Sequence, residues 1–255
     1  MADASIERAG GPLADVVAEA ERVLGAAEAG GVPLRLIGGL AVRLHTHAMR
    51  PALERSYADI DTATPKGKSR AVTALLEGLG YEAARQFNAL HGASRLLFHD
   101  RPNARKLDVF VHGFELNHSI PITARIDVQQ RTIPLAELLL TKLQVVEFTE
   151  KDLRDAVALL LSHEIAGHDD EAINAEVIAA LTADDWGLWR TTQLTIQRLR
   201  EGMGTLGLDP ADQQLVLERI DSLWDRIERE PKSRRWRLRA RVGDRKRWYQ
   251  VPDEV

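Results

Sequence analysis

The chain contains no cysteine, and it has no long apolar run. Without cysteine it has no disulfide, no thiolate zinc site and no thiol nucleophile, so a bound metal must use oxygen or imidazole ligands. No stretch approaches the roughly 18 consecutive apolar residues of a membrane span. The segment 1–17 lacks the basic-then-apolar pattern of a signal peptide. We therefore expect a cytoplasmic protein without a membrane partner.

The composition and the periodicity predict a soluble α/β (α+β) protein. Hydrophobic residues make up 44% and charged residues 28% of 255 residues, which is near the average for soluble proteins. The apolar pattern is mixed before residues 131–134 and almost entirely helical after them. We expect a small mixed β-sheet core with flanking helices over 1–133. A mainly helical domain with basic tail strands is expected over 134–255.

Basic residues are concentrated near the end of the chain. Residues 232–249 hold nine Lys and Arg against one acid, which leaves 25 bases and 37 acids, a net charge of -12, elsewhere. Apolar and basic residues alternate over 236–242, which predicts a strand, and Gly243-Asp244 predicts the turn of a basic β-hairpin. Two interpretations remain open. The hairpin is either a groove for RNA or another polyanion, with aromatic residues for stacking, or a packed strand with solvated arginines.

Two aspartates flank Ile60 on a predicted strand. Asp59 and Asp61 are two residues apart, so their carboxylates project to the same side, within reach of one cation. Magnesium prefers carboxylate and phosphate oxygens and relieves the repulsion between such acids. The alternative is common, because a lone Asp-x-Asp is more often a solvated strand end or a turn.

A third aspartate lies inside an apolar strand pattern. Asp108 falls within the predicted strand 106–112, although strands disfavour aspartate and burial of an unpaired carboxylate is costly. In an antiparallel neighbour of the first strand, Asp108 would face Asp59 and Asp61. Three converging carboxylates hold one or two magnesium ions in enzymes that catalyse in-line phosphoryl displacement.

A glycine pair precedes the acidic residues. Gly38 and Gly39 separate a predicted strand, 34–37, from a predicted helix, 40–45. Glycine lets backbone amides approach an anion, and the following helix N-terminus favours phosphate. A plain turn is the alternative. No single motif is specific, but their order along the chain is: a strand, Gly-Gly, a helix, Asp-x-Asp, and then one aspartate in a strand.

That order resembles the DNA polymerase beta-like nucleotidyltransferase superfamily, and more closely its AbiEii-type branch, which includes toxins of toxin–antitoxin systems. The matching stretches are IGGLAVRLH (37–45), ERSYADID (54–61), KLDVFV (106–111), PLAELLLTKLQ (134–144) and KDLRDAVALL (151–160). The resemblance implies a nucleoside triphosphate and Mg²⁺ held at the sheet edge. The resemblance implies that Gly38 and Gly39 form the phosphate-binding turn and that Asp59 and Asp61 are metal ligands. It also implies that Asp108 is the third acid and helps to activate the acceptor hydroxyl.

The chain departs from the superfamily pattern at two points. Many members have Gly-Ser where this chain has Gly38-Gly39, which removes a hydroxyl contact to phosphate, although Gly-Gly is usual in the AbiEii-type branch. The interval from Gly39 to Asp59 is also longer than is common, and the extra residues lie around 45–53. This insertion is either a loop near the site or a sign of an altered substrate.

Lys142 lies in the apolar stripe of the predicted helix 134–146. An ammonium is unusual there unless an anion meets it, and a triphosphate would serve. The alternative is a side chain that extends past the core to water. The resemblance places Lys142, together with Asp152 and Asp155, in the nucleotide site. Asp152 also has the spacing of a capping box with Thr149, and periodicity does not decide between the two acids.

We therefore predict an enzyme, a magnesium-dependent nucleotidyltransferase that moves NMP from an NTP to a hydroxyl of tRNA or protein. As a toxin it would also bind an antitoxin protein. The alternative is a catalytically silent nucleotide- or RNA-binding module on the same fold. A zinc hydrolase is disfavoured because His163, Glu164 and His168 are spaced HExxxH and Gly167 interrupts the helix. His45 and His47 are interpreted as surface or loop residues.

Overall fold

A five-stranded mixed sheet forms one part of the molecule. The computed structural model describes residues 11–47 and 49–251, so part of the N-terminal segment tested for a signal peptide lies outside the described residues. The strand order is β1-β2-β5-β4-β3. The bounds are β1 Arg35–Leu36, β2 Ile60–Thr64, β3 Glu82–Ala83, β4 Arg95–Asp100 and β5 Arg105–Val111. This sheet with its flanking helices confirms the α/β fold class.

The strand pairing differs from the sequence prediction at one position that matters for the site. β5 pairs with β2 in parallel, whereas the sequence suggested an antiparallel neighbour for the strand of Asp108. The other three pairings in the sheet are antiparallel. The chain from β2 to β5 passes through α3 (Ser69–Gly78), β3, α4 (Arg85–His91) and β4, and this long crossover is what allows a parallel partner.

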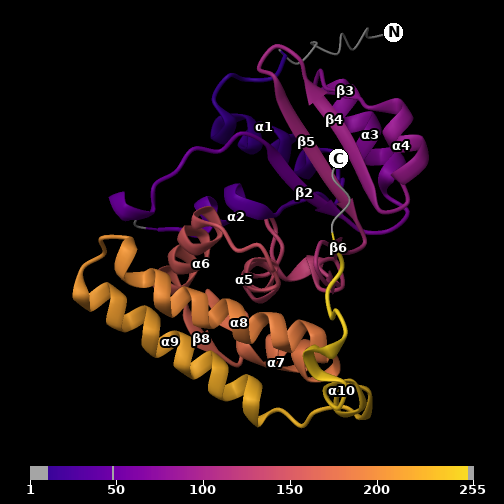
Figure 1. Ribbon diagram of the computed structural model, residues 1–255. Coiled ribbons are helices and arrows are strands. Elements are labelled where there is room, and N and C mark those ends of the chain that lie inside the picture. Colours follow the sequence, from indigo (N-terminus) through magenta and orange to yellow (C-terminus); the bar gives the residue numbers. More distant parts are fainter. Residues whose placement is uncertain (1–10, 48, 252–255) are drawn as a thin grey trace, which may run out of the picture.

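Four helices accompany the sheet. Their bounds are α1 Val16–Ala29, α2 Gly38–His45, α3 Ser69–Gly78 and α4 Arg85–His91. α1 begins where the Asp15 carboxylate accepts a hydrogen bond from the Ala18 amide, a typical N-cap. In Figure 1 the sheet, α1, α3 and α4 lie at one end of the molecule, and α2 lies between them and the later helices.

The second half of the chain is mainly helical, as its periodicity predicts. The helices are α5 Leu135–Leu143, α6 Glu150–Ser162, α7 Ala175–Asp184, α8 Trp186–Gly202, α9 Pro210–Arg229 and α10 Arg234–Ala240. Two small strand pairs lie outside the main sheet: β6 Phe114–Glu115 pairs with β7 Ser119–Ile120 before α5, and β8 Glu164–Ala166 pairs with β9 Ala172–Asn174 between α6 and α7. The helical pattern predicted after 131–134 was wrong over 172–174, where β9 pairs with β8.

One apolar cluster runs through both parts of the molecule. It includes Leu36 and Val109 from the sheet, Leu139 from α5 and Val216 from α9, all of them buried. The boundary between 133 and 134 stays a prediction, and the hydrophobic core passes across it. Within the described residues, no helix is both long and apolar enough to cross a membrane.

The predicted C-terminal β-hairpin was wrong. Residues 234–240 form α10, which Ser233 caps by accepting a hydrogen bond from the Trp236 amide. Trp236 packs edge-on against Trp189 of α8, with ring centroids 5.2 Å apart, and the Arg239 guanidinium lies over the ring of Trp186. Residues three apart share a helical face, so this packing selects the helix over the strand that the alternation suggested.

Candidate active site

Asp61 and Asp108 lie opposite one another in neighbouring strands. Asp61 of β2 and Asp108 of β5 are partners in the parallel register, so both side chains project from the same face of the sheet. Asp108 is buried and Asp61 is half-buried. The sequence predicted that these acids would meet, and the structure brings them together through parallel rather than antiparallel pairing.

Burial and a neighbouring carboxylate act on Asp61 in the same direction. Burial raises the pKa of Asp61 to about 6, and the charge of Asp108 adds to the rise, while Lys142 lowers it. Two like charges at neighbouring positions on one sheet face destabilise each other unless a cation lies between them. The electrostatics of the pair therefore favour a bound cation at neutral pH.

Asp59 has a different environment. It is exposed, and it precedes β2 rather than lying within it. Its Oδ1 atom accepts a hydrogen bond of 3.0 Å from the Lys106 amide at the start of β5. Among the described residues, Asp59, Asp61 and Asp108 do not form a group whose ligand atoms all lie within 4.8 Å of one another. In this arrangement Asp59 does not converge with the other two acids on one point.

The glycine pair forms the first turn of α2. Gly38 has φ +67°, a left-handed conformation that favours glycine, and Ile37 at the N-cap makes no side-chain capping bond. A Cβ atom on Gly38 would lie 2.6 Å from Oδ2 of Asp61. A Cβ atom on Gly39 would lie 1.8 Å from a guanidinium nitrogen of Arg55. A larger residue at either position would displace a charged side chain, and the positive φ of Gly38 also favours glycine there.

Lys142 of α5 meets both candidate acids of α6. Its Nζ atom lies 2.8 Å from Oδ2 of Asp155 and 3.9 Å from Oδ1 of Asp152. Asp152 also completes the capping box with Thr149 that the sequence spacing indicated. Asp155 is buried, and Arg55 donates two hydrogen bonds of 2.8 Å to it. Thus Lys142 does not extend freely to water but is held in a buried ion network.

Asp155 lies between two cations. Burial raises the pKa of Asp155, but Lys142 and Arg55 outweigh that effect and lower it below its usual value. Lys142 also lies 3.9 Å from Asp152, so two cations and two carboxylates form the network next to the Gly39 turn that Arg55 approaches. Cations beside a helix N-terminus are suited to a phosphate group.

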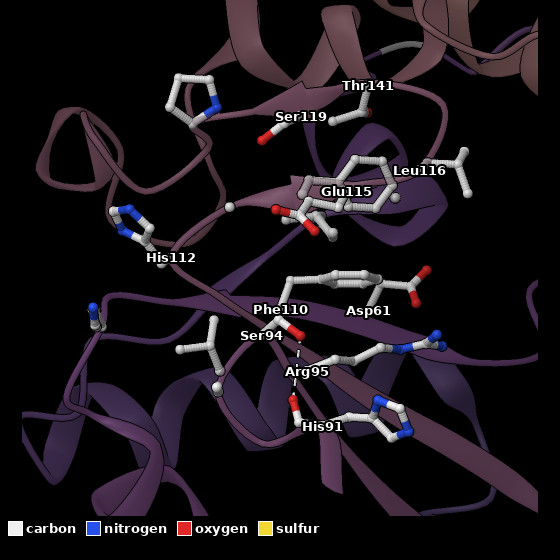
Figure 2. Close-up of a pocket in the computed structure, with 18 of the residues that line it drawn as sticks. Asp61, His91, Ser94, Arg95, Phe110, His112, Glu115, Leu116, Ser119 and Thr141 are labelled. Carbon is white, nitrogen blue, oxygen red and sulfur yellow. Dashed lines mark hydrogen bonds between the residues drawn. The ribbon is translucent and has the colours of Figure 1, made fainter. Parts of the chain in front are cut away.

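A cavity of about 610 Å³ opens on this region. Gly38, Asp61, Lys142 and Asp152 line it, whereas Asp108 is not part of the lining. The wall also contains an acid, Glu115, several polar and aliphatic residues, and the aromatic and basic side chains of Phe87, Phe110, Phe114, Lys66, Arg95 and His112. Figure 2 shows Asp61 and Arg95 beside the ring of Phe110. The volume and the mixed lining suit a small anionic ligand with an aromatic part.

The comparisons with known proteins give similarity in structure but none in sequence. No protein-family profile matches the chain, and no curated protein matches it. Among solved structures, the chain is similar to an antigenic nucleotidyltransferase-like protein from Paracoccidioides brasiliensis. The identity is 14% over 80% of this chain and 92% of that chain, with a TM-score of 0.43. At this similarity the comparison assigns no substrate and no residue role.

Two arginines in the site were not predicted from the sequence. Arg95 of β4 donates a hydrogen bond of 2.7 Å from Nε to Oδ1 of Asp108, and its guanidinium lies over Phe110 at 5.4 Å. Arg55 binds Asp155 and lies over the ring of Tyr57 at 4.4 Å. Arg55 falls within the stretch 54–61 that carries the resemblance, but its partner is 100 residues away, and no spacing rule connects them.

Proposed function

We propose that the protein is a divalent-metal-dependent nucleotidyltransferase that transfers NMP from an NTP to a hydroxyl acceptor. The observation that carries the proposal is the pairing of Asp61 with Asp108 on one sheet face, directly beside the first turn of α2. The cavity that Asp61 lines has the size of a small-molecule site, and Lys142 reaches it from α5. These parts come from separate segments and converge on one place.

The residues fit a magnesium ion. The donor set consists of carboxylate oxygens, which are the ligands that Mg²⁺ prefers, and Gly38 leaves room that a Cβ atom would fill. Asp61 and Asp108 would hold the ion, with Asp59 as a third ligand. When bound, Mg²⁺ would neutralise negative charge on the triphosphate and on the departing pyrophosphate.

The chain's own groups account for binding and proton transfer. Amides of the Gly38-Gly39 turn would bind phosphate oxygens, and Lys142 would place its charge beside them. The acceptor oxygen attacks the α-phosphorus, the new O–P bond forms, and the bond to the bridging oxygen breaks as pyrophosphate leaves. Asp108 would take the proton of the acceptor hydroxyl. Positioning and charge neutralisation would supply most of the rate.

The basic tail favours RNA as the acceptor. Arg234, Arg235 and Arg237 of α10 are exposed and have no acidic partner among the described residues. After α10 the chain returns to the turn between β6 and β7, where Gln250 exchanges two hydrogen bonds of 2.9 Å with Asn117. Leu116, the residue before Asn117, lines the cavity. We extend the proposal to an AbiEii-type toxin that modifies tRNA and is bound by an antitoxin.

Transfer of label from α-³²P-NTPs tests the function. The purified protein would be incubated with Mg²⁺ and each NTP, together with total tRNA or protein acceptors. We expect label in one acceptor and release of pyrophosphate. Asp61→Asn should abolish both, whereas Asp127→Asn, an exposed aspartate outside the site, should leave them unchanged. The absence of transfer to every acceptor with every NTP would contradict an active enzyme.

A second candidate function is a catalytically silent nucleotide- or RNA-binding module. The observation that favours it is the hydrogen bond between Arg95 and Asp108, because an arginine already occupies one proposed metal ligand. In that case Asp59→Ala and Asp108→Ala would leave the phenotype that the chain causes when expressed in cells unchanged. Truncation before Pro231 would abolish that phenotype. Loss of the phenotype in either aspartate variant would exclude the silent module.

A further inference from the structure

A second group of metal-binding side chains lies away from the aspartates. His47, which follows α2, His163 at the end of α6 and Glu171 between β8 and β9 each offer a ligand atom, and all three atoms lie within 4.8 Å of one another. His47 Nε2 is 3.5 Å from a carboxylate oxygen of Glu171. Three separate segments therefore bring two imidazoles and one carboxylate to one point.

His163 has an acceptor at each of its ring nitrogens. The ring is buried, with Nε2 3.0 Å from the His45 carbonyl oxygen and Nδ1 2.9 Å from the Glu171 carbonyl oxygen. A neutral imidazole carries one N–H, which satisfies one carbonyl and leaves the other nitrogen lone pair facing an oxygen lone pair. Such a buried contact between two acceptors is unfavourable unless a cation lies between them.

The surroundings of His163 match those of a metal-ligating histidine. Such residues usually donate the other ring N–H to a backbone carbonyl or carboxylate, which fixes the tautomer and the ring orientation. The His45 carbonyl fills that role at Nε2, so Nδ1 is the nitrogen left for a metal. The Nδ1 side is also where Glu171 lies, and the carboxylate of Glu171 meets His47.

We propose that His47, His163 and Glu171 form a site for a borderline divalent cation, Zn²⁺ in the first instance. Two imidazoles and a carboxylate suit zinc, with bonds of about 2.0–2.2 Å, whereas magnesium prefers oxygen ligands alone. His47 and Glu171 are 65% and 70% exposed at their side chains, so both can move inward to close the site around the ion. A water or the Glu171 carbonyl oxygen completes the coordination.

The position of this site gives it a role in ordering the proposed active site. α2 begins at the Gly38-Gly39 turn and ends at His45, two residues before His47. α6 carries Asp152 and Asp155 and ends directly before His163. A cation bound there ties the last turns of α2 and α6 together and fixes the phosphate-binding turn relative to the ion network of Lys142. The cation site stands without the transferase activity, whereas its role in ordering the phosphate-binding turn rests on the proposed function.

The site is tested by titrating the metal-stripped full-length protein with ZnCl₂ and measuring the heat of binding by calorimetry. We expect wild-type protein to bind Zn²⁺ at one site, and His47→Ala and Glu171→Gln each to weaken that binding by about tenfold or more. Both side chains are largely exposed, so neither variant should unfold. His168→Ala is the matched control, because His168 is an exposed histidine of the same loop and should not affect the affinity.

Two further measurements distinguish Zn²⁺ bound at this site from a metal bound at the aspartates and from a proton at Nδ1 of His163. Asp61→Asn should retain the Zn²⁺ affinity, since the proposed magnesium ligands are not involved. Co²⁺ in place of Zn²⁺ should give visible absorption that His47→Ala abolishes. The proposal is overturned if wild-type protein binds no Zn²⁺, which would mean that a second ring proton fills the gap at Nδ1. It is also overturned if the His47 and Glu171 variants bind as tightly as wild type.

Discussion

A Cβ atom placed on Gly38 would lie 2.6 Å from Oδ2 of Asp61. The first turn of α2 and the strand β2 are therefore fitted to one another at the point where a phosphate and a metal ion would meet. A Gly38→Ala substitution changes two things at once: it introduces a side chain at φ +67°, and it pushes a methyl group against the carboxylate. These two effects can be separated experimentally.

Gly38→Ala and Gly67→Ala should differ sharply. Both glycines have positive φ, but a Cβ atom on Gly67 would meet nothing within 4 Å. Each variant should lose about 1 kcal/mol of unfolding free energy from the backbone strain. Gly38→Ala should lose a further 1–3 kcal/mol, roughly, from overpacking, and it should also lose nucleotide binding. Urea denaturation and nucleotide titration measure both effects. Equal behaviour of the two variants would show that Gly38 is an ordinary turn residue.

Asp61 should make the metal-free protein less stable as the pH rises. Its pKa is raised from an unfolded value near 3.8 to about 6, so the folded state binds more protons than the unfolded state between these values. The unfolding free energy should therefore fall through this window, by up to about 3 kcal/mol. At pH 8 without metal, Asp61→Asn should be more stable than wild type by a similar amount.

Thermal denaturation at pH 4.5 and pH 8, with and without Mg²⁺, measures this effect. The stabilising effect of Asp61→Asn should shrink or reverse when Mg²⁺ is added, because wild type then gains the bound ion and the variant does not. If Asp61→Asn is destabilising at pH 8 in the absence of metal, the cost of burying an ionised Asp61 beside Asp108 is not the dominant effect at this position.

The ion network of α5 and α6 should respond unequally to the removal of its members. Asp155→Ala leaves Arg55 and Lys142 buried beside one another, and should cost about 3–5 kcal/mol. Lys142→Met should cost less, because Arg55 still holds both oxygens of Asp155. Lys142→Met should nonetheless remove nucleotide binding. Urea denaturation measures both losses of unfolding free energy. A larger loss for Lys142→Met than for Asp155→Ala would contradict this description of the network.

The basic tail should contain residues of two kinds. Arg237 is exposed and has no acidic partner within 11–47 and 49–251, so Arg237→Ala should weaken RNA binding and lower its salt dependence by about one phosphate contact, without affecting stability. Arg239 lies over Trp186 and donates hydrogen bonds to the Gly243 and Lys246 carbonyls, so Arg239→Ala should destabilise the tail. Binding assays over a range of salt concentrations, with thermal melts as the control, distinguish the two. RNA binding that Arg237→Ala does not change would favour a purely packed tail.

Local patterns predicted the elements that position the site. The alternation and β-branched residues of 106–112 gave β5, and the Thr149 to Asp152 spacing gave the cap of α6. The glycine pair did open a helix. In each case the determining interactions lie within a few residues, or follow from one face of a strand being buried. The order of the segments, rather than a local pattern, led to the expectation that Asp61 and Asp108 meet.

Long-range partners were not accessible in the same way. Whether β5 pairs with β2 in parallel depends on the path of the intervening chain, which carries no signature in either strand. Alternating residues over 236–242 fitted a strand, but Trp236 and Arg239 gain more by packing on α8 from a helix. The histidine and glutamate cluster of His47, His163 and Glu171 joins segments more than 100 residues apart, so motif spacing alone could not find it.

The most direct test of the central claim is the binding of a non-hydrolysable NTP analogue, measured by calorimetry in Mg²⁺ and in EDTA. We expect wild-type protein to bind the analogue in Mg²⁺ and to lose about tenfold or more of this affinity in EDTA. In Mg²⁺, Asp61→Asn and Asp108→Asn should each show a loss of similar size, whereas Asp127→Asn should bind as wild type does. An affinity that is the same in EDTA and in all three variants would show that Asp61 and Asp108 do not hold a metal-bound nucleotide.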